Sequence, residues 1–346
     1  MSRPYGLGAR AHLTLWSAVL IALGFVAPEA SAQGRIVFDT LHSRALRGNL
    51  VHDAPDREVL VYLPPSYASR ADARYPVAYL LHGATSTARE WIDGSYQGFD
   101  LRVAMDSLIA AGATEYIVVM LDADNQAGAV LYVDSPASGR WETLLTGELL
   151  AFIDGRYRTR PDAGHRGLVG FSLGGLAALH LAPRHPDLFG HVYAMSPCCL
   201  GFVAEMAPTG EAWVHGAMRQ WRMAAAFGPA PDRPPHFGRM PFAPRADGHV
   251  DSLPDELARW RLGLPLERVA QDAEALRRLH SLAIEVGTRE SPAFSVLPGT
   301  RAYVQALGRL GVPHTYVEFD GGHADRTRER LTGTVLPHFA RVLAAP

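Results

Sequence analysis

The chain has 346 residues, 48% hydrophobic and 20% charged, enough for one large α/β domain or at most two smaller ones. Its formal net charge of −2 gives no electrostatic basis for a nucleic-acid partner. All 33 basic residues are arginine, which excludes a Schiff-base lysine and a phosphate-loop lysine.

The first 32 residues have the three regions of a secretory signal peptide. Arg3 and Arg10 make a basic start, and an apolar stretch follows over residues 13–27. Ala30-Ser31-Ala32 supplies the small residues of a cleavage site. The apolar stretch is short for a membrane span. The alternatives to a cleaved signal peptide are an uncleaved anchor and a buried helix. We expect cleavage of 1–32, leaving a secreted or periplasmic domain, 33–346, without a stable membrane anchor.

After residue 33, apolar runs alternate with amphipathic stretches. Several runs are continuously apolar, as in parallel strands covered on both faces. The predicted strands are Arg35–Thr40, Glu58–Leu63, Pro76–Leu81, Tyr116–Leu121, Arg166–Phe171, His191–Met195, Leu282–Val286 and Thr315–Phe319. The predicted helices lie near Leu101–Ala111, Trp141–Tyr157, Leu173–Arg184, Leu266–His280, Thr300–Leu310 and Arg326–Leu343. The first two strands have no helix between them and should pair antiparallel. The order predicts an α/β fold with a doubly wound, mostly parallel, eight-stranded sheet.

The fifth strand meets the third helix at the pentapeptide Gly170-Phe171-Ser172-Leu173-Gly174. A serine on a sharp strand-to-helix turn exposes its hydroxyl at the carboxyl edge of the sheet. Glycines suit positions 170 and 174, because side chains there would collide across so tight a turn. The helix N-terminus favours negative charge developing beside it. This context predicts Ser172 as a nucleophile.

A serine hydroxyl needs a base in contact with it to act as a nucleophile at neutral pH. His323 is the expected base, because its glycine-rich loop follows the last strand and can bend toward the carboxyl edge. The orienting acid should follow the preceding strand, giving the chain order serine, acid, histidine. Glu290 has that place, and Asp320, closer to His323 in sequence, is the alternative. Glu285 lies within the strand and should point away.

An acyl-transfer site also needs donors for the oxyanion. The backbone N–H of Leu173 should be one, and that of Ala84, in the loop after the third strand, the other. Gly83 lets this loop approach the substrate closely. In the same region, His82 and Trp91 are candidate substrate-binding residues.

Cys198 and Cys199 are adjacent and are the only cysteines. Export would allow them to oxidise to a vicinal disulfide, although the Cα atoms of neighbouring residues are closer than in most disulfides. Two small buried hydrophobic residues at a strand end are an equal alternative. Two adjacent cysteines alone do not predict a metal site.

Residues 200–265 carry no predicted strand and are rich in Trp, Phe, Met and Pro. A long insertion in a compact domain usually has a function. Because it follows the sixth strand, we expect a cap over the carboxyl edge that binds substrate through Trp213 and Trp221. A structural excursion with its own small core is the alternative.

Several stretches match a known family jointly. They are Tyr79–Gly83 with Trp91, Gly139–Glu142, Glu148-Leu149, Ile153-Asp154, Tyr157–Thr159, Gly170–Gly175, His185-Pro186 with Phe189, and Gly321–His323. In these the chain resembles the esterase D and feruloyl-esterase-like branch of the α/β-hydrolases, which also contains the mycolyltransferases. The resemblance implies the α/β-hydrolase fold, a triad of Ser172, Glu290 and His323, and carboxyl-ester hydrolysis without metal or cofactor. Members often carry aspartate as the acid, so glutamate is a departure from the pattern.

These features predict a secreted serine esterase acting on a small-molecule, glycosyl or aryl ester. An acyltransferase would use the same acyl-enzyme with an alcohol in place of water, and the sequence does not separate the two. A binding protein on an inactive hydrolase fold is a third possibility, against which the presence of all three catalytic residue types argues.

Overall fold

The computed structural model describes residues 33–126, 131–201, 223–247, 249–291 and 296–344. The expected signal peptide, 1–32, therefore lies outside the described residues. Residues 33–346 form one unit by their internal contacts.

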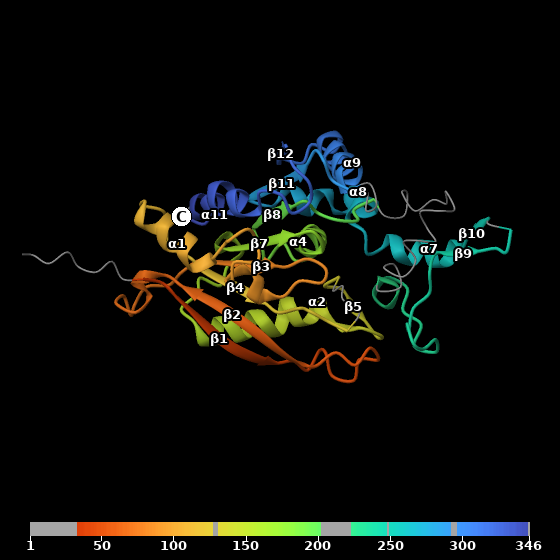
Figure 1. The fold of residues 1–346 in the computed structure, drawn as a ribbon, viewed down its shortest axis with the longest axis horizontal. Coiled ribbons are helices and arrows are strands. Elements are labelled where there is room, and N and C mark those ends of the chain that lie inside the picture. Colours follow the sequence, from red (N-terminus) through yellow and green to blue (C-terminus); the bar gives the residue numbers. More distant parts are fainter. Residues whose placement is uncertain (1–32, 127–130, 202–222, 248, 292–295, 345–346) are drawn as a thin grey trace, which may run out of the picture. The chain divides into compact units, whose positions relative to one another are not determined.

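An eight-stranded sheet runs through this unit in the order β1-β2-β4-β3-β7-β8-β11-β12 (Figure 1). β2 pairs antiparallel with both β1 and β4, and the other neighbours are parallel. The strands are β1 (Arg35–His42), β2 (Asp56–Leu63), β3 (Val77–Leu81), β4 (Ile117–Leu121), β7 (Arg166–Phe171), β8 (His191–Met195), β11 (Ser281–Gly287) and β12 (Thr315–Phe319). The predicted doubly wound sheet with an antiparallel start is thus confirmed, with every strand end within two residues of its prediction.

Burial along the strands explains why their sequences predicted them well. Every residue of β3, β4 and β7 is buried, so these strands read as continuous apolar runs. β12 lies at one edge of the sheet and keeps exposed residues at several positions, which suits an edge strand.

Helices cover both faces of the sheet. One face packs against α2 (Trp141–Thr143), α3 (Leu150–Arg156), α4 (Leu173–Arg184), α8 (Pro265–Arg277) and α9 (Val296–Arg309). The other packs against α1 (Leu101–Ala110) and α11 (Leu336–Val342), which lie side by side in Figure 1. The short α10 (Thr327–Arg330) precedes α11, and a π-helical stretch links each of the pairs α2–α3 and α10–α11. Among the described helices, not one has the length and apolar character needed to cross a bilayer.

The sequence indicated no strand in residues 200–265, and this prediction is wrong for the part that the structure describes. A small hairpin pairs β9 (Phe242–Pro244) with β10 (Val250–Ser252), and α7 (Pro254–Arg261) follows. Strands of three residues are too short for a recognisable alternation. Met223 and Trp260 are buried in the same apolar cluster as one face of the sheet. The described part of this segment is therefore anchored in the main core.

Cys198 and Cys199 are joined by a disulfide and are both buried. They follow β8 at the carboxyl edge of the sheet. The N–H of Cys198 donates to the carbonyl of Ser172 at 3.1 Å, so this pair packs directly against the serine turn.

Candidate active site

Ser172 stands between the last residue of β7 and the first of α4, with φ 58° and ψ −116°. A positive φ is unusual for a residue with a side chain, and such strain gathers at functional sites. Two backbone hydrogen bonds hold the turn: the N–H of Ser172 donates to the Met195 carbonyl at 2.9 Å, and the carbonyl of Ser172 accepts from the N–H of Cys198 at 3.1 Å. Leu173 opens α4, where the first N–H groups have no partner within the helix.

Three glycines make this turn possible. A Cβ on Gly170 would lie 1.9 Å from the carbonyl oxygen of Gly174, and a Cβ on Gly174 would lie 2.2 Å from that of Leu81. A Cβ on Gly83 would lie 3.0 Å from the Cβ of Ser172. The loop after β3 thus runs against the serine, as expected of the loop that carries Ala84.

His323 and Glu290 meet across two loops at the same edge of the sheet. His323 Nδ1 lies 2.8 Å from Glu290 Oε2, and the glutamate side chain is only 1% exposed. The loops are tied by the N–H of Arg289, which donates to the Gly321 carbonyl at 2.9 Å. Glycine suits position 321 in this loop, because a Cβ there would lie 2.8 Å from the Phe319 ring and 3.0 Å from the Cβ of Asp325.

The same imidazole lies beside the serine turn. Its ring centroid is 5.0 Å from that of Phe171, the residue before Ser172. Within the described residues no hydrogen bond joins Ser172 Oγ to His323. Such bonds are often long in a free enzyme and shorten when substrate binds.

The two other carboxylates near this loop have different partners. Asp320 is 79% exposed on its side chain and pairs with Arg289. Glu285, buried in β11, pairs with Arg330 through Arg330 Nε and Glu285 Oε1 at 2.7 Å. Glu290 is therefore the carboxylate that the fold brings to His323.

His82 and Trp91, two of the candidate substrate contacts, are 1% and 0% exposed. His82 Nε2 accepts a hydrogen bond from the Ala123 N–H at 2.9 Å, and burial lowers the pKa of this imidazole. Neither side chain is accessible to a substrate in this structure, and both instead support the loop that follows β3. Sequence alone places a residue in a loop but does not give the direction of its side chain.

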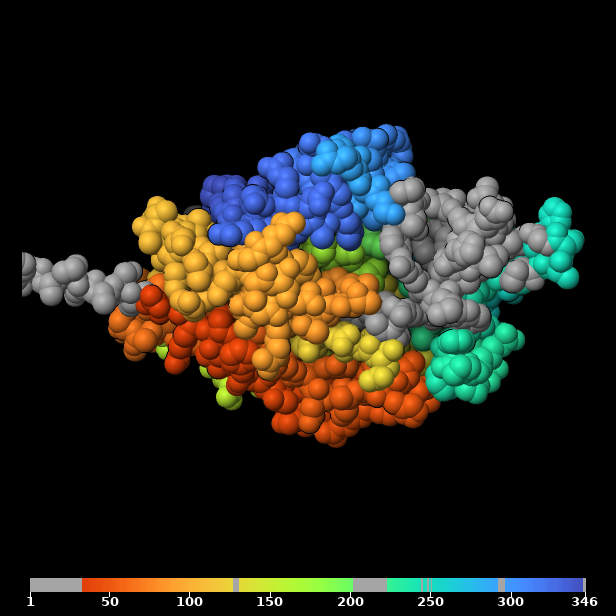
Figure 2. Space-filling view, in the orientation of Figure 1, coloured from red at the N-terminus to blue at the C-terminus, as the bar shows by residue number. Residues whose placement is uncertain are grey.

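Tyr96 and Gln97, which the sequence interpretation missed, lie nearer the site. Tyr96 stacks on Trp91 at 4.7 Å between centroids and meets Phe171 edge-on at 5.9 Å. Gln97 Nε2 donates to the carbonyl of Ala324, next to His323, at 3.1 Å. In Figure 2 the segment after β3, in orange, accordingly lies against the blue C-terminal part. The aromatic residues at positions 91, 96 and 99 are the sequence feature that could have pointed to this segment as part of the site.

The candidate residues Trp213 and Trp221 lie outside the described residues. Searched over the described ranges alone, the chain has no cluster of three or more His, Cys, Asp or Glu side chains placed to hold a metal ion.

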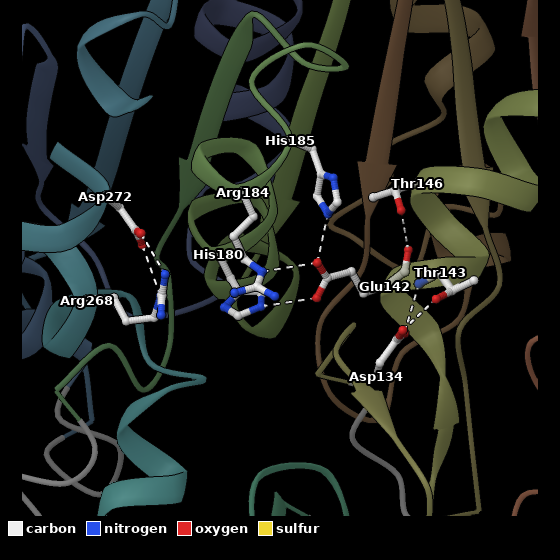
Figure 3. A network of polar contacts seen from close by, with 9 residues as sticks. All are labelled: Asp134, Glu142, Thr143, Thr146, His180, Arg184, His185, Arg268 and Asp272. Atoms are coloured by element: carbon white, nitrogen blue, oxygen red, sulfur yellow. Dashed lines mark hydrogen bonds and ion pairs between the residues drawn. The ribbon is translucent and has the colours of Figure 1, made fainter. Parts of the chain in front are cut away.

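Glu142, in one of the family-like stretches, belongs to a polar network between α2 and α4 and contacts none of the triad candidates (Figure 3). Its carboxylate lies 2.7 Å from His185 Nε2, 3.1 Å from Arg184 Nε and 3.6 Å from His180 Nε2. Burial by itself would raise the pKa of Glu142, but the histidine contacts and the arginine charge outweigh it and hold that pKa far below its ordinary value. This network joins two helices under the sheet.

Comparison with known proteins gives three kinds of match. The model of a family described as "Putative esterase" matches residues 54–333. An esterase of Mycobacterium tuberculosis is 26% identical over 282 residues, 78% of this chain and 52% of that protein. The diacylglycerol acyltransferase/mycolyltransferase of Mycobacterium leprae is 30% identical over 163 residues, 43% of this chain and 47% of that protein. The chain thus spans about half the length of these curated relatives.

Among solved structures, a ferulic acid esterase is similar with a TM-score of 0.64 at 25% identity. The similarity covers 90% of this chain and 99% of that one.

Proposed function

The chain belongs to this esterase family and has the α/β-hydrolase fold, and from that premise we propose that it is a serine esterase that hydrolyses carboxylic esters. The observation that carries the proposal is the 2.8 Å contact between His323 Nδ1 and Glu290 Oε2, with the imidazole packed beside the serine turn. An imidazole that donates Nδ1–H to a carboxylate keeps Nε2 as its basic nitrogen.

In the proposed reaction, Ser172 Oγ attacks the ester carbonyl while His323 Nε2 accepts its proton. The tetrahedral intermediate collapses when His323 returns this proton to the leaving alcohol, which leaves an acyl group on Ser172. Water, deprotonated by His323, then attacks the acyl-enzyme, and the acid is released as His323 returns the proton to Ser172 Oγ. Glu290 holds the imidazole in orientation and stabilises its positive charge.

The backbone N–H groups of Ala84 and Leu173 are the proposed oxyanion donors. Two observations support this assignment: Leu173 opens α4 directly after Ser172, and a Cβ on Gly83, the residue before Ala84, would lie 3.0 Å from the Cβ of Ser172. Removing one such donor in a serine hydrolase costs about 3–4 kcal/mol of transition-state stabilisation.

We place the substrate among aryl, glycosyl or short acyl esters and the protein outside the cytoplasm. The similar solved structure is a ferulic acid esterase, an enzyme named for esters of an aromatic acid. The composition of residues 1–32 supports export as a secreted or periplasmic protein. The cap role of residues 200–265, with Trp213 and Trp221 as substrate contacts, also belongs to this proposal.

Acyl transfer is the second candidate, supported by the match to an acyltransferase of Mycobacterium leprae. It needs no change in Ser172, His323 or Glu290, because only the acceptor that attacks the acyl-enzyme differs. Product analysis with and without added alcohol separates the two reactions.

Hydrolysis of a series of p-nitrophenyl esters tests the proposal. We expect turnover by the wild type and a loss of kcat/KM on the order of 10⁴-fold or more in Ser172→Ala, since the nucleophile is removed. The fold of the variant, checked by circular dichroism and melting temperature, should be unchanged. Activity of Ser172→Ala within about tenfold of wild type would refute Ser172 as the nucleophile.

A further inference from the structure

A buried arginine lies directly behind the histidine loop. Arg330 ends α10, is 5% exposed, and directs its guanidinium back toward the carboxyl edge of the sheet. Arg330 Nη1 donates to the carbonyl of His323 at 3.2 Å and to that of Asp325 at 3.4 Å. Arg330 Nη2 donates to Ser196 Oγ at 3.1 Å. The side chain therefore bonds the loop that carries the imidazole to the segment that follows β8.

The charge of Arg330 is matched by Glu285 in β11. Arg330 Nε donates to Glu285 Oε1 at 2.7 Å, and the Tyr193 hydroxyl donates to Oε2 at 2.9 Å. Both charged side chains are about 5% exposed or less. A buried ion pair gives little net stability compared with apolar residues of the same size, because both charges lose their hydration. Stability alone therefore does not account for this pair.

The flat face of the guanidinium is also fixed. It lies 4.1 Å from the ring centroid of Phe319 and 5.9 Å from that of Phe171. The loop it holds begins with Gly321 and Gly322, which have the widest backbone freedom of any residue type. A glycine loop needs external contacts to keep one conformation, and Arg330 supplies two of them at backbone carbonyls.

We propose that Arg330, with its charge matched by Glu285, is a positioning residue that holds the backbone of the histidine loop so that the imidazole of His323 faces Ser172. This inference rests on the proposed esterase function for its kinetic consequence. Glu290 fixes the ring of His323 through Nδ1, and Arg330 fixes its main chain, so the two together define the direction of Nε2. Arg330 touches neither substrate nor the reacting atoms.

The test variant is Arg330→Lys. Lysine keeps the positive charge beside Glu285, but a single ammonium cannot reproduce the planar fork that reaches Ser196 and both loop carbonyls. We expect kcat to fall by ten- to a hundredfold, because small misplacements of a catalytic group have effects of this order. KM should stay within about threefold, because Arg330 contacts no substrate.

Arg166→Lys is the matched control. Arg166 is also buried and pairs with Asp154, but it begins β7 at the opposite end of the strand from Ser172. It should lower the melting temperature comparably and leave kcat unchanged. If Arg330→Lys does not fold, the double variant Arg330→Met/Glu285→Gln replaces it, since it removes both charges and leaves Tyr193 an acceptor.

A second measurement does not depend on ester turnover. In ¹⁵N-histidine-labelled protein, the proton on His323 Nδ1 bound to Glu290 should give a downfield resonance, assigned by its loss in His323→Gln. Arg330→Lys should shift or broaden this signal, and Arg166→Lys should not. A wild type that shows the signal but hydrolyses no ester would refute the esterase proposal and leave the positioning role testable by the spectrum.

A kcat loss of tenfold or more in Arg330→Lys, with a changed His323 signal and an unaffected control, supports the positioning role. A smaller kcat loss in folded protein, an unchanged His323 signal, or an equal kcat loss in Arg166→Lys overturns it.

Discussion

The sequence offers two carboxylates, Glu290 and Asp320, as the acid that orients His323, and the two differ in burial. Glu290 is almost fully enclosed and lies against His323, whereas Asp320 is exposed and pairs with Arg289. Within the described residues, the second oxygen of Glu290 is buried without a hydrogen-bond partner, so His323 is the polar contact of this carboxylate. An enclosed charge interacts with a developing imidazolium more strongly than an exposed one, because water screens it less.

Glu290→Gln should therefore lower kcat/KM by about 10²- to 10⁴-fold, since the amide no longer stabilises a charged imidazole. Asp320→Asn should change it by less than about threefold, because an exposed ion pair contributes little. Both variants are compared on one ester. If Asp320→Asn is the more damaging of two folded proteins, the acid is misassigned.

The serine turn requires glycine at the positions that flank Ser172, because a side chain there would collide with the backbone. Gly174→Ala would force a Cβ against the Leu81 carbonyl, where no flexible side chain can move aside. We expect a loss of about 1–3 kcal/mol of stability, with reduced activity as the turn shifts. Gly308→Ala, in α9, is the control, because a Cβ added at Gly308 would have no neighbour within 4 Å. This variant should stabilise the folded protein by about 0.5–1 kcal/mol. Equal urea midpoints for the two variants would contradict this account.

Three carboxylates in the family-like stretches have structural partners. They lie in α2, in α3 and in the π-helical stretch between these helices. Glu142 in α2 binds His180 and Arg184 of α4 and His185 directly after it. Glu148 accepts hydrogen bonds from the N–H groups of Arg44 and Ala45 at 3.0 Å each. Asp154 in α3 accepts a hydrogen bond from Thr159 at 2.7 Å. These carboxylates connect the helical layer to loops and to α4.

Glu142→Gln should lower stability at pH 7 by about 1.5–3 kcal/mol, the range for hydrogen bonds to a charged group. Because the folded-state pKa of Glu142 is depressed, its contribution is fully present above the unfolded value of about 4.3 and is lost progressively as the pH falls from there toward the folded-state pKa. The difference in melting temperature between variant and wild type should therefore begin to narrow below about pH 4 and continue to narrow as the pH falls further. Asp272→Asn, which breaks only the pair within α8, is the control.

The regular elements could be predicted from the sequence because burial on both faces leaves a continuous apolar run. β7, β8 and β12 have the predicted ends, and α4 ends where His185 precedes a proline. The hairpin of β9 and β10 could not be predicted from the sequence, because strands of three residues leave no periodic signal. The π-helical stretch after α2 could not be predicted either, because it differs from an α-helix only by a local change in hydrogen bonding. The pairing of Glu290 with His323 followed from strand order, whereas Arg330 depends on contacts distant in sequence.

The whole chain combines an expected signal segment with an α/β-hydrolase domain. We predict that the mature protein begins near Gln33, because the small residues at 30–32 suit signal peptidase. N-terminal sequencing of protein from the extracytoplasmic fraction of a bacterial host checks this. A start at Met1 in a membrane fraction would mean that the apolar stretch is an anchor.

Formation of a covalent acyl-enzyme on Ser172 is the central claim for the molecule, because esterase and acyltransferase share it and an inactive binding protein lacks it. The most direct measurement is peptide mass spectrometry of protein acid-quenched during turnover of a p-nitrophenyl ester. The account predicts one acyl group on the peptide that contains Ser172 and none in Ser172→Ala. Turnover without an adduct on that peptide, or an equal adduct in Ser172→Ala, would contradict it.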